Sequence, residues 1–236
     1  MLKFNFAEGE LLLLDKPHKW TSFDVVSKIR YALKPLKLKV GHAGTLDPLA
    51  TGLLVICTGK LTKKIDELQA QEKEYTGTIV LGATTPSYDL ETEIVGYTDI
   101  SHLTEAGIVN AAASFEGEIQ QFPPAHSAVK IDGERSYEKA RRGEQVLTKS
   151  RTVTISTFEI TRIALPEVDF KVVCSKGTYI RSLAHDMGQK LSCGAYLSNL
   201  RRTRSGQFKV DQAWQLPDLV QELVRLKAEG LNVANR

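Results

Sequence analysis

The chain has 236 residues, of which 42% are hydrophobic and 25% are charged, as in an ordinary globular domain. This composition excludes a fibrous, disordered or disulfide-dense protein. The net charge of +3 is too small to indicate a nucleic-acid partner by itself. Residues 25–46, however, contain five basic and no acidic side chains, and residues 171–209 contain eight basic ones against Asp186 alone. These stretches would attract a phosphate backbone if they shared a surface; scattered surface charges are the alternative.

Cysteines, histidines and apolar runs indicate the redox compartment and whether to expect a metal site or a membrane segment. Cys57, Cys174 and Cys193 are an odd number without C-x-x-C spacing, which favours a reducing cytoplasm. The five histidines lack the spacing of metal ligands, so we expect no metal site. The apolar run of residues 11–14 is too short for a signal peptide or a membrane span, and we expect neither.

Hydrophobic periodicity predicts the elements in chain order. A buried strand at residues 11–14 precedes a helix that begins after Thr21, with Asp24 completing a capping box, and stops at Pro35. A glycine-rich loop at 41–52 leads into a strand at 53–57 and a short helix at 61–68. Later elements are a strand at 75–81, a loop at 83–93, a helix at 108–115, paired strands at 153–163 and 170–175, a helix at 180–191, a hairpin at 197–210 and a helix at 216–226.

This mixture lacks regular βαβ alternation, so we predict an α+β fold with a mixed, mostly antiparallel sheet flanked by helices and loops. One large domain is expected over residues 1–215, with residues 216–236 a helical tail. Only 236 − 215 = 21 residues follow Gln215, fewer than the roughly 50 that a further domain needs.

The glycine-rich loop contains a single acid, Asp47, between the basic stretch and the buried strand. Pro48 favours extended geometry at Asp47, and the flanking glycines permit close approach of another backbone. Such a loop could present the carboxylate into a cleft. An Asp-Pro pair by itself is more often a turn.

Several motifs resemble the bacterial tRNA pseudouridine synthase B family. The string G-H-A-G-T-L-D-P-L-A-T-G-L-L at residues 41–54 is similar to the catalytic motif of that family. Similar motifs lie, in the expected order, at residues 13–17 with 20–22, 73–75, 127–130 (Ser127, Ala128, Val129, Lys130) and 174–181. The resemblance spans about residues 11–210 and implies that residues 1–215 are the catalytic domain. Members of the family commonly carry an additional C-terminal RNA-binding domain, for which the 21 residues after Gln215 leave no room. The chain departs from the family at Lys19, often a glycine, and in the loop 84–93, which leaves the role of Asp89 open.

The resemblance implies isomerisation of the T-loop uridine of tRNA to pseudouridine, with no redox cofactor. The family pattern implies a catalytic Asp47 carboxylate, which either adds covalently to sugar or base or removes a sugar proton. It also implies that Arg181 orients this carboxylate and that Tyr75 stacks on the uracil. His42 would stack where the base has left, and Tyr179 and Leu200 would line the uridine pocket.

The expected partner is the T-stem and loop of tRNA, with no obligate protein partner and no membrane. The basic side chains that could bind RNA phosphates are Lys130, Arg141, Arg142, Arg201, Arg202 and Arg204. Two alternatives stay open: an RNA-binding or tRNA-folding module without catalysis, and a pseudouridine synthase that acts on another RNA site.

Overall fold

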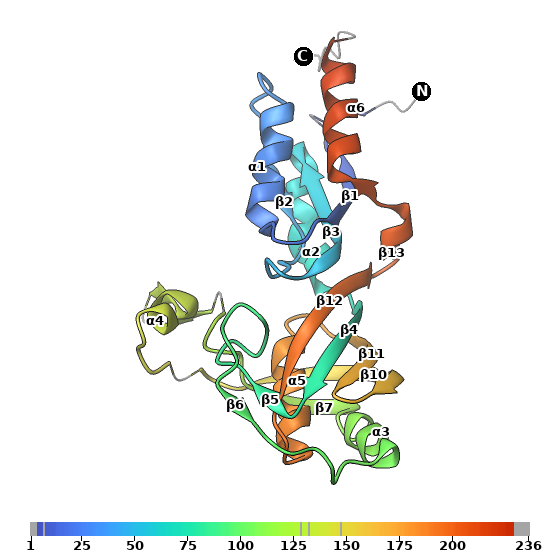
Figure 1. Cartoon of the computed structure of the whole chain (residues 1–236). Helices are drawn as coiled ribbons and strands as arrows, with labels where there is room; N and C mark the ends of the chain where they lie inside the picture. The colour runs from blue at the N-terminus through green and yellow to red at the C-terminus, as the bar shows by residue number, and fades with distance from the viewer. Residues whose placement is uncertain (1–3, 7, 128, 132, 147, 229–236) are drawn as a thin grey trace. The chain divides into compact units, whose positions relative to one another are not determined.

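The computed structural model describes residues 4–6, 8–127, 129–131, 133–146 and 148–228 (Figure 1). Ala128 of the expected motif and residues 229–236 of the expected tail lie outside these residues. The chain forms two compact units: a first unit of residues 1–73 and 201–236, and a second unit of residues 74–200. The chain leaves the first unit after Lys73 and returns to it along one strand.

That strand is β12 (Ala195–Ser205), whose residues up to Leu200 belong to the second unit and the rest to the first. The other elements of the first unit are β1 (Leu11–Lys16), α1 (Ser22–Ala32), β2 (Val40–His42), β3 (Thr51–Thr58), the 3₁₀ helix η1 (Gly59–Lys64), α2 (Ile65–Ala70), β13 (Phe208–Lys209), η2 (Val210–Gln212), β14 (Trp214–Gln215) and α6 (Leu216–Ala228).

The sheet of the first unit has the order β14-β1-β3-β12, and β1 runs antiparallel to β3. Alternation along β1 directs Leu12 and Leu14 to one face, where they pack with the apolar stripes of α1 and α6. Leu11 and Leu13 pack on the opposite face. Helices α1 and α6 lie side by side over the first face (Figure 1). The last helix therefore belongs to the core of this unit.

Helix α1 begins where its sequence predicts. Thr21 accepts a hydrogen bond from the backbone N–H of Asp24, and the Asp24 carboxylate accepts one from the backbone N–H of Thr21. This capping box satisfies two backbone donors at the helix start. The hydrogen bonds to Thr21 lower the pKa of the exposed Asp24 carboxyl.

The second unit contains β4 (Lys73–Leu81), β5 (Ala83–Thr84), β6 (Gly96–Tyr97), α3 (Glu105–Ala113), β7 (Gly117–Gln121), β8 (Lys130–Ile131), β9 (Glu134–Arg135), α4 (Ser136–Arg141), β10 (Arg151–Ala164), β11 (Glu167–Cys174) and α5 (Ile180–Lys190), with the first part of β12. Its main sheet has the order β12-β4-β11-β10-β7. Strand β10 pairs antiparallel with both β11 and β7. Phe158 on β10 packs edge-on against Phe170 on β11. Helix α3 packs on β10 and α5.

The observed elements confirm the α+β class and the mixed, mostly antiparallel sheet. The expected paired strands are β10 and β11, and the expected hairpin joins β12 to β13. The structure contains further elements that were not predicted: β2, β5, β6, β7, β8, β9, α4, η2 and β14. Of these, β2 and β5 overlap the loops expected at residues 41–52 and 83–93. Each of the unpredicted elements is short, and its hydrophobic pattern is too brief to define a period.

Candidate active site

The loop that carries Asp47 connects β2 to β3 in the first unit. Gly44 and Gly52 adopt left-handed backbone conformations, with φ of 98° and 101°. A side chain at Gly52 would lie 2.3 Å from the carbonyl oxygen of Arg202 on the neighbouring strand, so this position requires glycine. Asp47 is half-buried, and its carbonyl oxygen accepts a hydrogen bond from Ala50 N–H at 3.1 Å.

Lys16 fastens this loop to the end of β1. Its side chain is fully buried, and Nζ donates to the carbonyl oxygens of Trp20 at 2.6 Å, Pro17 at 3.0 Å and Pro48 at 3.2 Å. An ammonium has three N–H donors, so the three carbonyls use them all. The residue that follows Asp47 is thereby bonded to a segment 32 residues away.

Ser22 and Arg202 support the same loop from two other directions. The Ser22 hydroxyl accepts from Leu46 N–H at 2.9 Å and donates to Leu46 O at 3.2 Å. Arg202 Nε donates to Leu53 O at 2.7 Å and Nη2 to Gly44 O at 3.1 Å.

The expectation that Arg202 binds an RNA phosphate is corrected by these contacts. Its side chain is 1% exposed, and its guanidinium points at loop carbonyls instead of solvent. A buried guanidinium with these acceptors positions the loop.

Burial shifts the pKa of two side chains of the first unit, Lys16 and His42. It lowers the pKa of Lys16 to about 8; the Asp47 carboxylate opposes this shift and the Arg202 guanidinium adds to it. Burial, with a contribution from Arg202, also lowers the pKa of His42. The lowered pKa favours the neutral form of the His42 ring.

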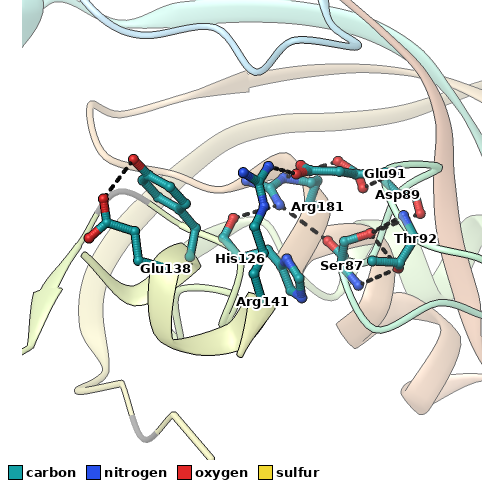
Figure 2. Close-up of polar contacts among 9 residues, drawn as sticks. Ser87, Asp89, Glu91, Thr92, His126, Glu138, Arg141 and Arg181 are labelled. Carbon is teal, nitrogen blue, oxygen red and sulfur yellow. Dashed lines mark hydrogen bonds and ion pairs between the residues drawn. The ribbon is translucent and has the colours of Figure 1, made fainter. Parts of the chain in front are cut away.

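In the second unit, Arg181 lies in the first turn of α5 and is 3% exposed. Nη1 donates to His126 O at 3.0 Å and to Ser87 O at 3.2 Å, and Nε lies 3.6 Å from Oδ2 of Asp89 (Figure 2). A cation at a helix start is unfavourable against the helix dipole, and the Asp89 carboxylate compensates for it. Asp89, left open by the sequence, thus has a defined partner.

The loop that presents Asp89 is closed by its own side chains (Figure 2). Thr85 and Ser87 donate from their hydroxyls to Asp89 O at 2.7 and 3.1 Å. Ser87 and Thr92 share a hydroxyl–hydroxyl hydrogen bond of 2.8 Å, and Asp89 Oδ1 accepts from Glu91 N–H at 3.0 Å. The loop therefore carries a local hydrogen-bond network.

The remaining expected pocket residues all lie in the second unit. Tyr75 is on β4 and 9% exposed, and Leu200 is on β12 and 8% exposed. Tyr179 directly precedes α5. Its backbone N–H donates to Gln121 Oε1 at 2.8 Å, and its carbonyl accepts from Gln121 Nε2 at 3.0 Å.

Four of the expected phosphate-binding arginines form ion pairs with acidic side chains. Arg201 makes a bidentate pair with Asp15, Arg204 pairs with Glu72, Arg141 with Glu91, and Arg142 with Glu134 and Glu144. Lys130 belongs to β8. Exposed pairs of this kind contribute little to stability, about 0–1 kcal/mol.

Sequence analysis missed the supporting residues Lys16, Ser22 and Gln121. Lys16 and Ser22 belong to the motif at residues 13–17 and 20–22, which was the available signal, although the motif did not define their role. Gln121 belongs to none of the motifs, so no sequence signal indicated it.

Among the residues that the structure describes, no group of three His, Cys, Asp or Glu side chains could hold a metal ion. No helix in the described ranges is long and apolar enough to cross a membrane.

Comparisons with known proteins agree with the fold and with the motif in the loop that carries Asp47. The model of the TruB family pseudouridylate synthase N-terminal domain matches residues 30–180, and that of the tRNA pseudouridylate synthase B C-terminal domain matches residues 181–233. The tRNA pseudouridine synthase B of Flavobacterium johnsoniae is 59% identical, over 88% of this chain and 93% of that protein. That of Phocaeicola vulgatus is 54% identical, over 88% and 90%.

A solved structure is similar along nearly the whole chain. A chain of the Cbf5-Nop10-Gar1 complex superposes with a TM-score of 0.73 and 33% identity, covering 97% of this chain. The present chain spans 58% of that longer chain. Fold and loop together define a pseudouridine synthase-like protein. The chain belongs to the TruB family of pseudouridylate synthases.

Proposed function

We propose that the protein isomerises the T-loop uridine of tRNA to pseudouridine. Conversion of uridine to pseudouridine in tRNA is the activity for which its relatives are named, at 49–59% identity over most of the chain. The choice of the T-loop follows from the motifs at residues 13–22 and 41–54 and from the family resemblance.

The reaction breaks the bond from N1 of uracil to C1′ of ribose and forms a bond from C5 to C1′. The proton on C5 leaves to solvent or base, and N1 gains a proton, so the composition is unchanged. The isomerisation therefore requires no redox cofactor.

The observation that carries the proposal is the fixed loop around Asp47. Lys16, Ser22 and Arg202 bond the backbone on both sides of this residue. A carboxylate on a loop fixed by hydrogen bonds is preorganised for covalent addition or proton removal. The entropy of orienting it is lost on folding and not during the reaction. We therefore assign the catalytic role to the Asp47 carboxylate.

The other assignments follow from residue type and burial. Tyr75 and Arg181 are both buried, and we assign to them base stacking and orientation of an anionic group. His42, Tyr179 and Leu200 offer flat or apolar surfaces of the kind that receive a flipped base. Lys130, Arg141, Arg142, Arg201 and Arg204 are our candidates for contacts with the tRNA backbone.

Asp47→Asn tests the proposal against a purely binding role. Turnover is followed by tritium release from a tRNA transcript labelled at C5 of uridine, and binding by filter retention on the same transcript. We expect turnover to fall at least about 10³-fold, while the tRNA Kd stays within about threefold because phosphates dominate affinity. The control is Asp66→Asn, an exposed acid on α2 of the same unit, which should leave both unchanged.

Two results would count against the proposal. Activity of Asp47→Asn within tenfold of wild type would remove Asp47 from catalysis. Wild-type protein that binds the transcript and releases no tritium would be an RNA-binding module.

A further inference from the structure

Arg151, the first residue of β10, has two buried hydrogen-bond donors that no described residue satisfies. Its guanidinium carbon lies 4.4 Å from the centroid of the Tyr179 ring. Nε and Nη2 are buried, and neither has a hydrogen-bond partner among the described residues. These two nitrogens form one edge of the guanidinium, the fork that binds two oxygens of a carboxylate or phosphate.

Tyr179, on which this guanidinium stacks, is held by a buried amide. Gln121 is fully buried on β7, directly opposite Arg151 in the register of β7 and β10. It accepts from Tyr179 N–H at 2.8 Å and donates to Tyr179 O at 3.0 Å. The ring and the guanidinium are therefore both fixed to the same pair of strands.

The turn before Tyr179 completes the surroundings of Arg151. Ser175 N–H donates to Thr154 O at 2.8 Å, and the Thr178 hydroxyl donates to Ser175 O at 2.9 Å, so the turn is tied to β10. Gly177 has a φ of 83°, and a side chain there would lie 3.4 Å from Arg151 Nη1. Exposed Lys176 adds a second positive charge to this turn.

The two unsatisfied donors distinguish Arg151 from three ion-paired arginines of the second unit. Arg141, Arg142 and Arg162 are ion-paired to acids, whereas Arg151 forms no ion pair within the described part of the chain. Leaving buried donors unsatisfied costs about 1–3 kcal/mol each, more when they are charged. Such a cost is retained where a ligand supplies the acceptors.

We propose that the Nε and Nη2 fork of Arg151 binds a phosphate of the RNA substrate. The proposal rests on the proposed function, in which Tyr179 lines the uridine pocket. The phosphate is then that of the target nucleotide or of an immediate neighbour, because the guanidinium lies on the Tyr179 ring. A phosphodiester has the two non-bridging oxygens and the negative charge that the fork requires.

The test is a binding cycle on a T-arm hairpin. Single linkages around the target uridine are replaced, one at a time, by neutral methylphosphonates, and Kd is measured for wild type, Arg151→Gln and Arg151→Lys. Arg162→Gln is the matched control, since Arg162 lies on the same strand and is half-exposed. On native RNA we expect Arg151→Gln to bind about tenfold more weakly and to lower the salt dependence by about one charge.

One neutral linkage should cost wild type about tenfold and Arg151→Gln less than about twofold, since the two changes remove the same contact. Arg151→Lys retains the charge without the fork and should fall between. Equal costs in wild type and Arg151→Gln at every linkage, or an unchanged salt slope, would overturn the proposal. If Arg151→Gln fails to fold, the same comparison with Arg151→Lys decides.

The binding cycle also separates this proposal from the proposed function. Wild-type protein without turnover would refute the proposed isomerase activity. The difference between wild type and Arg151→Gln in the Kd cost of each neutral linkage would still show whether Arg151 binds a phosphate. A lower turnover rate in Arg151→Gln with equal linkage costs in the two proteins would mean that Arg151 only positions Tyr179, which would also overturn the phosphate site.

Discussion

Two loops carry an acid that concerns the site: residues 43–50 carry Asp47 and residues 85–92 carry Asp89. They differ in the side chains that hold them by hydrogen bonds. The first is bonded by buried side chains from distant segments: Lys16 reaches Pro48 over 32 residues, and Arg202 reaches Gly44 over 158. The second is bonded by its own hydroxyls, within five residues of one another, and also by Arg181, which donates to Ser87 O (Figure 2).

This difference concerns both stability and function. A buried cation that donates to carbonyls leaves them unsatisfied when it is removed, which is costly. Removing one hydroxyl from the local network of the second loop leaves its other hydrogen bonds and the contact of Arg181 with Ser87 O in place, so the loss is smaller. Loss of a support should therefore matter most in the first loop, less at the Asp89 and Arg181 pair, and least at exposed arginines.

The largest effect is expected for Arg202→Met, which removes the donors to Leu53 O and Gly44 O. We expect the free energy of unfolding to fall by about 3 kcal/mol and kcat/KM to fall about 100-fold. Urea unfolding and tritium release measure these quantities. Arg201→Met, which breaks a half-exposed pair with Asp15, should cost at most about 1 kcal/mol of stability. Equal losses of stability in the two variants would refute the positioning role of Arg202.

Asp89→Asn should reduce kcat about tenfold, because Arg181 loses a charged partner but retains the carbonyls of Ser87 and His126. The tRNA Kd should not change. Asp99→Asn, which alters an exposed acid of the same unit, is the control and should be silent. A wild-type kcat in Asp89→Asn would show that the pair is not needed for turnover.

The charge on Lys16 should couple stability to pH. Its pKa is about 8 in the folded protein, below the ordinary value of 10.5 retained by the unfolded chain. Between these values the unfolded chain binds more protons, so stability rises with pH, by at most about 1.4 kcal/mol per unit. The stability of wild type relative to Lys16→Met should therefore increase from pH 8 to pH 10 in urea unfolding. A difference independent of pH would contradict the shifted pKa.

The smallest effect is expected for Arg142→Gln on the exposed α4 segment. Stability should change by less than about 0.5 kcal/mol, and the tRNA Kd should rise about threefold with a shallower salt dependence. Arg162→Gln is matched to it, since Arg162 is equally exposed at 49% and also pairs with two acids. Equal tRNA binding by the two variants would remove Arg142 from the RNA contacts.

The sequence predicts what local patterns determine. The capping box of α1, the strands β10 and β11 and the apolar face of α5 follow from hydrophobic periods and cap residues. The motif around Asp47 identified the loop itself. Its supports could not be derived, because Lys16 and Arg202 meet it only through the strand pairing of β1, β3 and β12.

The roles of the arginines show the same limit. Arg201 and Arg202 are adjacent and were given one role, yet alternation along β12 places the first in a half-exposed ion pair and buries the second. Arg151 carried no motif, and its unused donors are visible only once Tyr179 and Gln121 are in place.

Nucleotide-resolution mapping of pseudouridine in a full tRNA transcript tests the central claim most directly. Wild-type protein should produce one strong signal at the T-loop uridine, and a transcript with cytidine at that position should show none. A signal that persists elsewhere after the replacement would assign the enzyme to another uridine. No signal in either transcript would contradict the account.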